Sequence, residues 1–169
     1  MNGFRVLSPQ RCFELIATWV NVPWPITVYQ GEEMASKLGW LPSGEEGAAL
    51  FMSELADGES DTWLDELGGY VSCVTIPLTS RAANEEGVQA RPIIVNLFQK
   101  VEYLLVERYG APTKSYMEDG VYTSEWELPS GVEMDLSYHD LSMFSSVYSP
   151  DYSALLNDPA SGPNFDEGE

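Results

Sequence analysis

Apolar residues share one helical face near the start of the chain. Ser8 and Pro9 form a typical helix start, with serine as the N-cap and proline at the first helical position. The apolar residues that follow on this face are Phe13, Ile16, Ala17 and Val20. The pattern predicts a helix from Pro9 to Val20, which the following prolines end because they disfavour helix at the preceding residue. Thr27 and Gln30 form a capping box, which predicts a second, shorter helix ending at Gly39.

The middle of the chain carries one strong strand pattern and one strong helix pattern. Tyr70 to Leu78 is rich in Val, Ile, Thr and Tyr and has apolar residues on both faces, which predicts a central strand. Arg81 to Arg91 is polar and predicts a loop. Pro92 then begins the longest helix, which ends before Gly110 and Pro112. Its broad apolar stripe consists of Ile94, Leu97, Phe98, Val101, Leu104 and Leu105.

Alternation of polar and apolar residues becomes the main pattern after the long helix. Three segments with the strand period predict an antiparallel meander: Tyr122 to Leu128, Val132 to Tyr138 and Met143 to Tyr148. By contrast, Leu41 to Gly69 has no clear period. Within it, Ala48 to Leu55 fits either a strand or a helix, and Asp57 to Glu66 predicts an acidic loop around Trp63.

These elements predict an α+β fold. We expect a mostly antiparallel sheet of four to five strands, with the N-terminal helices and the long helix packed on it. The 169 residues, of which 44% are hydrophobic, suffice for one core. We therefore predict a single domain over residues 1–149 and an acidic, flexible tail over residues 150–169, where prolines, glycine and acids dominate.

Charge narrows the possible partners more than any motif does. The formal net charge is −19, from 27 acidic and 8 basic residues, and no Lys or Arg follows Lys114. Affinity for nucleic acid and for anionic membrane surfaces depends on Lys and Arg, so this balance argues against both. A basic protein is the natural complement, because opposite charge steers association. Acidity that serves only solubility is the alternative.

The predicted hairpin concentrates this charge. With a short turn at Pro129 to Gly131, Glu127 pairs with Glu133 and Glu125 pairs with Asp135 on the outer face. Like charges placed opposite each other destabilise a sheet by up to about 1 kcal/mol per pair. Three explanations stay open: carboxylates that splay into water and discourage pairing with other edges, a surface that receives Lys and Arg from a partner, and a divalent cation or an acid–base pair. We take these four carboxylates as the first candidate contacts for a basic partner.

A second acidic group lies in the predicted loop around Trp63. Its candidate contacts are Asp57, Glu59 and Asp61. The spacing superficially resembles a calcium loop. With Asp57 in position one, however, the sixth residue is Thr62 where glycine is needed, and the twelfth is Gly68 where glutamate is needed. We therefore predict an exposed binding loop and no metal site.

Groups suited to catalysis are scarce. His139 is the only histidine and lies at a predicted strand end beside Asp140, with no GxSxG or cysteine-centred signature to accompany it. Cys12 and Cys73 lie far apart among apolar residues, which predicts buried free thiols. Walker, GxGxxG and HExxH motifs are absent from the sequence. We expect a non-enzymatic protein without cofactors and, in the absence of a signal peptide or a membrane-spanning run, a cytoplasmic one.

The order of elements resembles that of an uncharacterised family of small actinobacterial proteins. The resemblance rests on Phe4 to Leu7 before a helix, Trp24-Pro25, Leu38-Gly39-Trp40, Tyr109-Gly110-Ala111-Pro112, Trp126 in a strand, and the strand Val132 to Leu136. More broadly, a long helix followed by Gly-x-Pro and three strands is similar to many immunity proteins of bacterial polymorphic-toxin systems.

This second resemblance implies a small, acidic, cytosolic protein that neutralises a cognate toxin by direct binding. The expected function is therefore that of an immunity protein against a basic toxin, a nuclease being one candidate. The same order of elements also resembles secretion chaperones of the type III and related classes, so a chaperone-like adaptor for an exported protein is the alternative. Neither resemblance implies catalytic residues.

Overall fold

The computed structural model describes residues 3–43 and 49–158. The helices in these ranges are α1 (Pro9–Val20), α2 (Val28–Lys37), the 3₁₀ helix η1 (Asn84–Glu86), α3 (Gly87–Tyr109) and α4 (Pro150–Leu156). The strands are β1 (Leu41–Pro42), β2 (Leu50–Met52), β3 (Thr62–Leu67), β4 (Tyr70–Pro77), β5 (Lys114–Glu118), β6 (Val121–Glu127), β7 (Glu133–Tyr138) and β8 (Met143–Tyr148). All eight join one antiparallel sheet in the order β1-β2-β3-β4-β8-β7-β6-β5.

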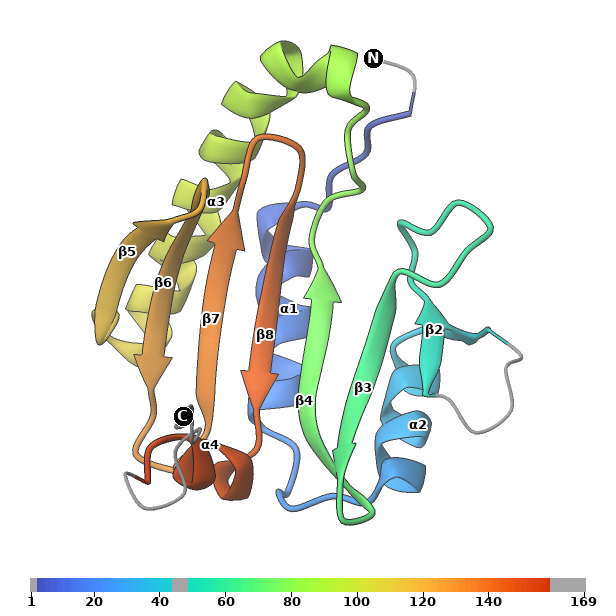
Figure 1. Cartoon of the computed structure of the whole chain (residues 1–169), viewed down its shortest axis with the longest axis vertical. Helices are drawn as coiled ribbons and strands as arrows, with labels where there is room; N and C mark the ends of the chain where they lie inside the picture. The colour runs from blue at the N-terminus through green and yellow to red at the C-terminus, as the bar shows by residue number, and fades with distance from the viewer. Residues whose placement is uncertain (1–2, 44–48, 159–169) are drawn as a thin grey trace, which may run out of the picture.

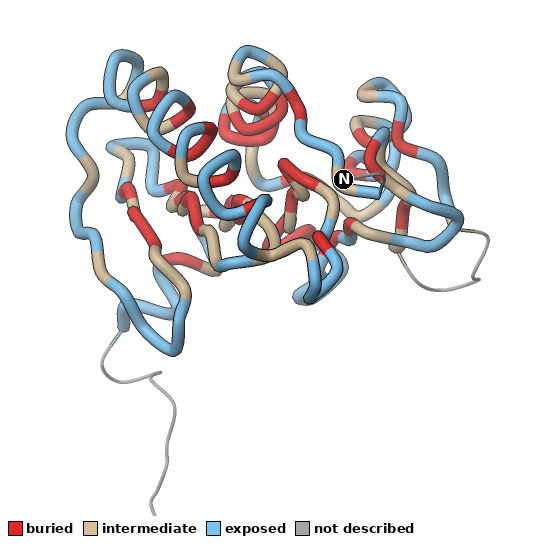
Figure 2. Tube along the Cα trace, turned by 90° about the horizontal axis from the view of Figure 1, so that it is seen from above, coloured by how far each residue is buried: buried red, intermediate tan, exposed pale blue. Residues whose placement is uncertain are grey.

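Helices α1, α2 and α3 lie on one face of this sheet, which we call the inner face (Figures 1 and 2). Phe98 of α3 packs edge-on against Tyr122 and Tyr138, with ring centroids 5.4 and 4.9 Å away. Gly31 of α2 is so close to the sheet that an added Cβ would lie 2.8 Å from Cγ2 of Val71. The other face, the outer face, is covered within the described residues only at one end, by α4 (Figure 1).

The core lies between the helices and the inner face. Trp19, Trp40 and Trp126 are the largest fully buried side chains. The rings of Trp19 and Trp40 are 5.7 Å apart and link α1 to the start of β1. Trp126 donates its indole N–H to the carbonyl oxygen of Gly110 at 2.8 Å, which ties the end of α3 to β6. Burial of Trp19 and the inward position of Trp126 agree with the helical and strand periods of the sequence.

Several local predictions are confirmed. Helix α1 has the predicted bounds, and its Ser8 hydroxyl accepts from the backbone N–H of Arg11 at 3.1 Å. Both bonds of the capping box between Thr27 and Gln30 are present at α2. Strand β4 is central, between β3 and β8, and the C-terminal meander of β6, β7 and β8 occurs as predicted. The α+β class with an antiparallel sheet is therefore correct.

The predicted sheet of four to five strands is wrong, because the sheet has eight strands. Strand β5 escapes prediction because it is a short edge strand, mostly exposed on both faces, and so has no apolar alternation. Strands β1 and β2 have only two and three residues. Strand β3 lies mostly within the segment predicted as an acidic loop, because Asp65 and Glu66 are exposed and interrupt its apolar pattern.

The long helix begins earlier than predicted. Arg81 to Arg91, predicted as a loop, contains η1 and the first residues of α3, which starts at Gly87. Pro92 therefore lies inside the helix. A proline near a helix start removes few backbone hydrogen bonds, but it bends the helix axis. Figure 1 shows the first turns of α3 lying across the end of the sheet before the helix continues along it.

The segment after β8, predicted as an acidic, flexible tail, begins with a helix. Pro150–Leu156 forms α4, whose N-cap Ser149 accepts from the backbone N–H of Tyr152 at 3.0 Å. The ring of Tyr152 stacks on Tyr148 of the outer face at 6.1 Å, which docks the helix on the sheet. The rest of the predicted tail, residues 159–169, lies outside the described residues. None of the helices in the described ranges combines the length and the apolar character needed to span a membrane.

Candidate functional site

The outer face brings the two predicted acidic groups onto one surface. Residues directly opposite each other in neighbouring strands point to the same face of a sheet. The ladder pairs form one continuous row across six strands: Lys114, Glu125, Asp135, Ser146, Thr75 and Trp63. The hairpin residues Glu125 and Asp135 follow Lys114 near one end of this row, and Trp63 at the other end follows the loop that carries Asp57, Glu59 and Asp61. The sequence could not show this, because β4 joins β8 across a long stretch of chain.

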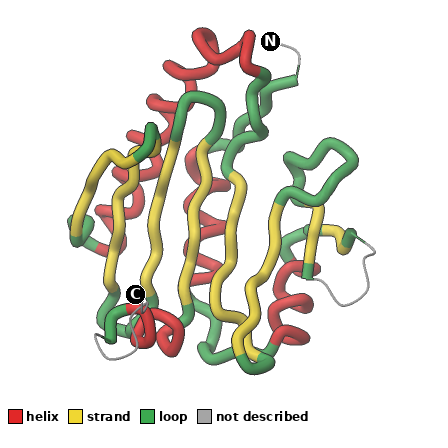
Figure 3. The backbone as a smooth tube through the Cα atoms, viewed as in Figure 1, coloured by secondary structure: helices red, strands yellow, loops and turns green. Residues whose placement is uncertain are grey.

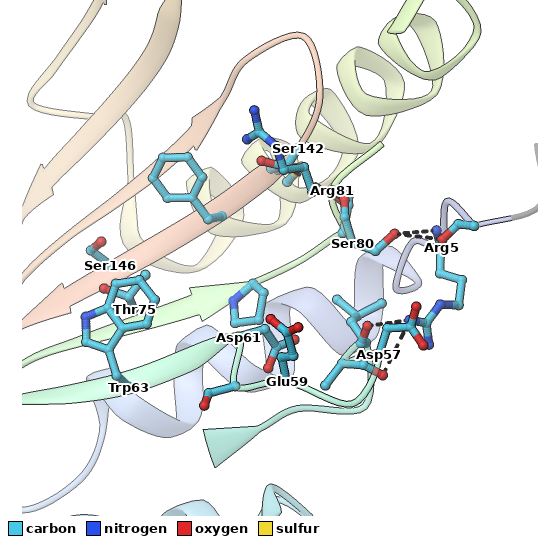
Figure 4. Close-up of a pocket in the computed structure, with 18 residues that line it drawn as sticks. Arg5, Asp57, Glu59, Asp61, Trp63, Thr75, Ser80, Arg81, Ser142 and Ser146 are labelled. Carbon is cyan, nitrogen blue, oxygen red and sulfur yellow. Dashed lines mark hydrogen bonds between the residues drawn. The ribbon is translucent and has the colours of Figure 1, made fainter. Parts of the chain in front are cut away.

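A groove of about 750 Å³ occupies the β3, β4 and β8 part of the outer face. Its floor is formed by outward side chains of β4 and β8: Thr75, Pro77, Phe144 and Ser146. Trp63 of β3 closes one end and keeps 39% of its surface exposed. Figure 4 shows Trp63, Thr75 and Ser146 together at that end, with Arg5 and Ser80 at the other.

The loop between β2 and β3, drawn in green in Figure 3, carries residues that form one wall of the groove (Figure 4). Asp61 holds it closed by accepting from the backbone N–H and the hydroxyl of Ser53, at 2.7 and 2.6 Å. The guanidinium of Arg5 donates to the carbonyl oxygen of Leu55 at 2.5 Å. Asp57 and Glu59 are exposed on this fixed loop, and neither makes an ion pair within the described residues. Asp61 is thus a structural residue, whereas Asp57 and Glu59 are available for binding.

The hairpin carboxylates pair as predicted, Glu127 with Glu133 and Glu125 with Asp135, but most of them have internal partners. Glu125 accepts from the hydroxyl of Tyr116 at 2.5 Å, and this hydrogen bond raises the pKa of Tyr116 to about 12. The carboxylate of Glu125 also lies 3.7 Å from the ammonium of Lys114.

Helix α4 supplies the partners of Glu133. Its carboxylate accepts from the hydroxyl of Ser153 at 2.5 Å and from the side-chain amide of Asn157. Glu127, by contrast, is exposed, while Glu125, Glu133 and Asp135 are half-buried. The hairpin is therefore a carboxylate network with one freely accessible member, and not the fully open acidic face that the sequence suggested.

Asp135 lies at the centre of this network. It accepts from the backbone N–H of Ser146 at 3.0 Å and from the hydroxyl of Tyr148 at 3.4 Å. Burial raises the pKa of Asp135 to about 7, and the charges of Glu125 and Glu133 act in the same direction, while the two hydrogen bonds oppose them. The like-charge conflict of the hairpin is thus reduced near neutral pH by partial protonation of Asp135.

His139 lies in the turn between β7 and β8. Its Nδ1 accepts from the backbone N–H of Leu141 at 3.1 Å, so the neutral ring donates through Nε2 to the hydroxyl of Ser142 at 2.9 Å. Burial, and after it the charge of Arg81, lowers the pKa of this histidine. The neighbouring Asp140 pairs with Arg91 and not with the imidazole. His139 therefore stabilises the turn between β7 and β8.

Two further predictions concern metal-binding and thiol groups. Cys12 and Cys73 are buried and free, as predicted, and burial raises the pKa of each thiol to about 12. Across the described ranges, no cluster of three or more His, Cys, Asp or Glu side chains has a geometry that could hold a metal ion.

Comparison with known proteins assigns the chain to a family through residues 10–143, which match the model of a family of unknown function. The chain belongs to the DUF6301 family. No curated protein and no solved structure shows a significant match. The matched residues include the helical layer and most of the sheet, up to the first residue of β8. The family has no assigned activity.

The sequence missed the floor of the groove in this DUF6301 protein. Phe144 is half-buried between the fully buried Met143 and Ser145, so the strand period of β8 already places an aromatic residue on the outer face. Trp63 could have been recognised as outward only if β3 had been predicted as a strand. A strand-borne aromatic that points away from the helices is the signal that would have found this site.

Proposed function

We propose that this protein is a non-enzymatic binding protein whose outer sheet face binds a basic partner protein. The supporting observation is the arrangement of layers: three helices cover the inner face, and the outer face keeps a groove bordered by the exposed carboxylates of Asp57 and Glu59. Acidic residues on this face and its loop outnumber basic ones, so the surface attracts a cationic partner and accelerates its approach.

The biological role that fits best is that of an immunity protein, which blocks a toxin domain by covering its basic surface. Carboxylates would then occupy the positions where a nuclease, for example, holds phosphate groups. Among the seven candidate contacts, Asp57, Glu59 and Glu127 are exposed and are proposed as the direct contacts. Glu125, Glu133, Asp135 and Asp61 already have internal hydrogen bonds and would contribute mainly negative potential.

The test is co-expression with the basic C-terminal domain of a secreted protein encoded beside this chain. Wild-type protein should restore growth and form a complex with that domain. The double variant Asp57→Lys with Glu59→Lys should weaken the complex, with loss of association rate appearing first and with strong salt dependence. Glu32→Lys with Glu33→Lys, two exposed acids on α2 in the helical layer behind the sheet, is the matched control. A neighbouring toxic domain that binds the double variant and the wild type equally well would contradict the proposal.

One observation favours a secretion-chaperone-like adaptor as a second candidate. The floor of the groove includes the apolar surfaces of Phe144 and Pro77, and chaperones of that class bind exported segments through apolar surfaces. This candidate predicts a homodimer by light scattering and strong binding of a dye that reports exposed apolar surface. A monomer that binds little dye would favour the immunity role.

A further inference from the structure

We propose that the groove receives an arginine side chain of the partner, with the guanidinium stacked on Trp63 and paired with Glu59. This inference rests on the proposed function, because it names the chemical group of a basic partner that enters the groove. It adds a requirement that net charge alone does not impose: a planar cation must meet an aromatic ring.

The groove offers an apolar surface of the right kind for the stem of such a side chain. Phe144 is half-buried on the floor, next to Pro77, and Trp63 leaves more than a third of its surface exposed at one end. The three methylenes of an arginine bury readily on apolar surface while the head group stays polar. The volume of about 750 Å³ also leaves space for the flanking backbone of the partner.

The charges of the groove restrict where the cation can lie. Asp57 and Glu59 line the loop wall without an ion pair in the described part of the chain. Arg5 donates to the carbonyl oxygens of Leu55 and Ala56, so Asp57 lies at the Arg5 end of this wall and Glu59 lies on the side of Trp63 (Figure 4). An incoming cation is therefore attracted to Glu59 and repelled from the end that holds Arg5. The bonds of Asp61 to Ser53 already hold this loop in place, so binding costs little additional ordering.

Arginine fits these two features better than lysine does. A guanidinium is planar and weakly hydrated, so it can stack on an indole and still donate to a carboxylate through its edge. An ammonium is a compact, strongly hydrated charge that gains less from the ring. An apolar side chain would fill the floor but would leave Asp57 and Glu59 facing a partner without a counter-charge.

The test uses two probes of equal charge, hexa-arginine and hexa-lysine peptides, titrated at low salt into the full-length protein. Binding is followed by calorimetry and by the indole N–H resonance of Trp63 in a nitrogen–proton correlation spectrum, assigned with the variant Trp63→Phe. We expect hexa-arginine to bind more tightly and to shift this resonance. Trp63→Leu should weaken hexa-arginine about two- to fivefold, the effect expected for one exposed cation–π contact, and should leave hexa-lysine unchanged.

Two further variants make the result specific. Trp63→Phe keeps an aromatic face and should retain most of the preference for arginine. Tyr29→Leu removes an aromatic residue that is 69% exposed on α2, away from the groove, and should have no effect. Equal affinity for the two peptides, or equal losses in Trp63→Leu and Tyr29→Leu, would overturn the inference while leaving a charge-driven partner intact. Failure of both peptides to bind the wild-type protein would overturn the proposed function as well.

Discussion

Glu125 and Asp135 lie directly opposite each other in the ladder between β6 and β7, and Asp135 is the one whose pKa rises to about 7. The carboxylate of its neighbour Glu125 accepts one hydrogen bond from Tyr116 and lies near the ammonium of Lys114. Burial therefore favours the protonated form of Asp135 up to about neutral pH.

This pair predicts a pH-dependent stability. The folded pKa of Asp135, about 7, exceeds its ordinary value of 3.8, so between these pH values the folded state binds more protons than the unfolded state. Its contribution to the free energy of unfolding is therefore greatest at low pH, falls as pH rises through this window, and levels off above it. Between about pH 5.5 and pH 8, it should fall by about 2 kcal/mol.

Asp135→Asn isolates this effect, because asparagine keeps the shape and cannot ionise. Urea unfolding of wild type and variant at the two pH values should show a difference between them that grows by about 2 kcal/mol in favour of the variant at the higher pH. Asp151→Asn, an exposed carboxylate on α4, is the control and should show no such change. Parallel pH profiles for wild type and Asp135→Asn would refute the assignment.

A second prediction concerns the loop wall of the groove. Asp61→Ala removes the acceptor for both the backbone N–H and the hydroxyl of Ser53, and should lower the free energy of unfolding by about 1–3 kcal/mol. Hydrogen exchange at the Ser53 amide should accelerate at the same time. Asp57→Ala, on the same loop but exposed, should change stability by less than about 0.5 kcal/mol. Similar effects of the two substitutions would mean that Asp61 does not hold the loop.

The close contact of α2 with the sheet predicts that an alanine in place of Gly31 destabilises the protein. Gly31→Ala would place a Cβ 2.8 Å from Cγ2 of Val71 and 2.9 Å from Cδ1 of Leu64. Overpacking should lower the free energy of unfolding by about 1–3 kcal/mol. This loss should exceed the gain of up to about 1 kcal/mol that the higher helix propensity of alanine provides. Thermal unfolding would register the loss, and Glu33→Ala on the exposed side of α2 should be nearly neutral. A Gly31→Ala variant as stable as wild type would show that α2 moves away freely.

The bond between Trp126 and Gly110 predicts a measurable coupling of α3 to β6. Trp126→Phe removes the indole donor and leaves a void in a site with 1% exposure, so we expect a loss of about 2–3 kcal/mol. Trp63→Phe, at a partly exposed site, should cost much less in the same urea titration. Equal losses at the two positions would argue against a specific role for this hydrogen bond.

Local chemistry explains which elements could be predicted. The caps at Ser8 and Thr27, the apolar stripe of α3 and the alternation of β6 and β7 all depend on residues a few positions apart. The hairpin register followed from the same alternation, since a slip of one residue would have turned every acid inward. Strands β1, β2, β3 and β5 lack such a signal, because they are short or mostly exposed, and their place depends on the neighbour that they pair with.

The sequence by itself determined α1, α2, the main part of α3, the meander and the division of the hairpin into an apolar and an acidic face, because each of these is encoded by neighbouring residues. Only the tertiary structure decided which acids are accessible and what lies beside them. Pairing of β4 with β8 builds the groove next to Trp63, and docking of α4 covers Glu133. Both depend on contacts between segments that are distant along the chain. A local sequence pattern cannot predict the burial and hydrogen bonding that such contacts create.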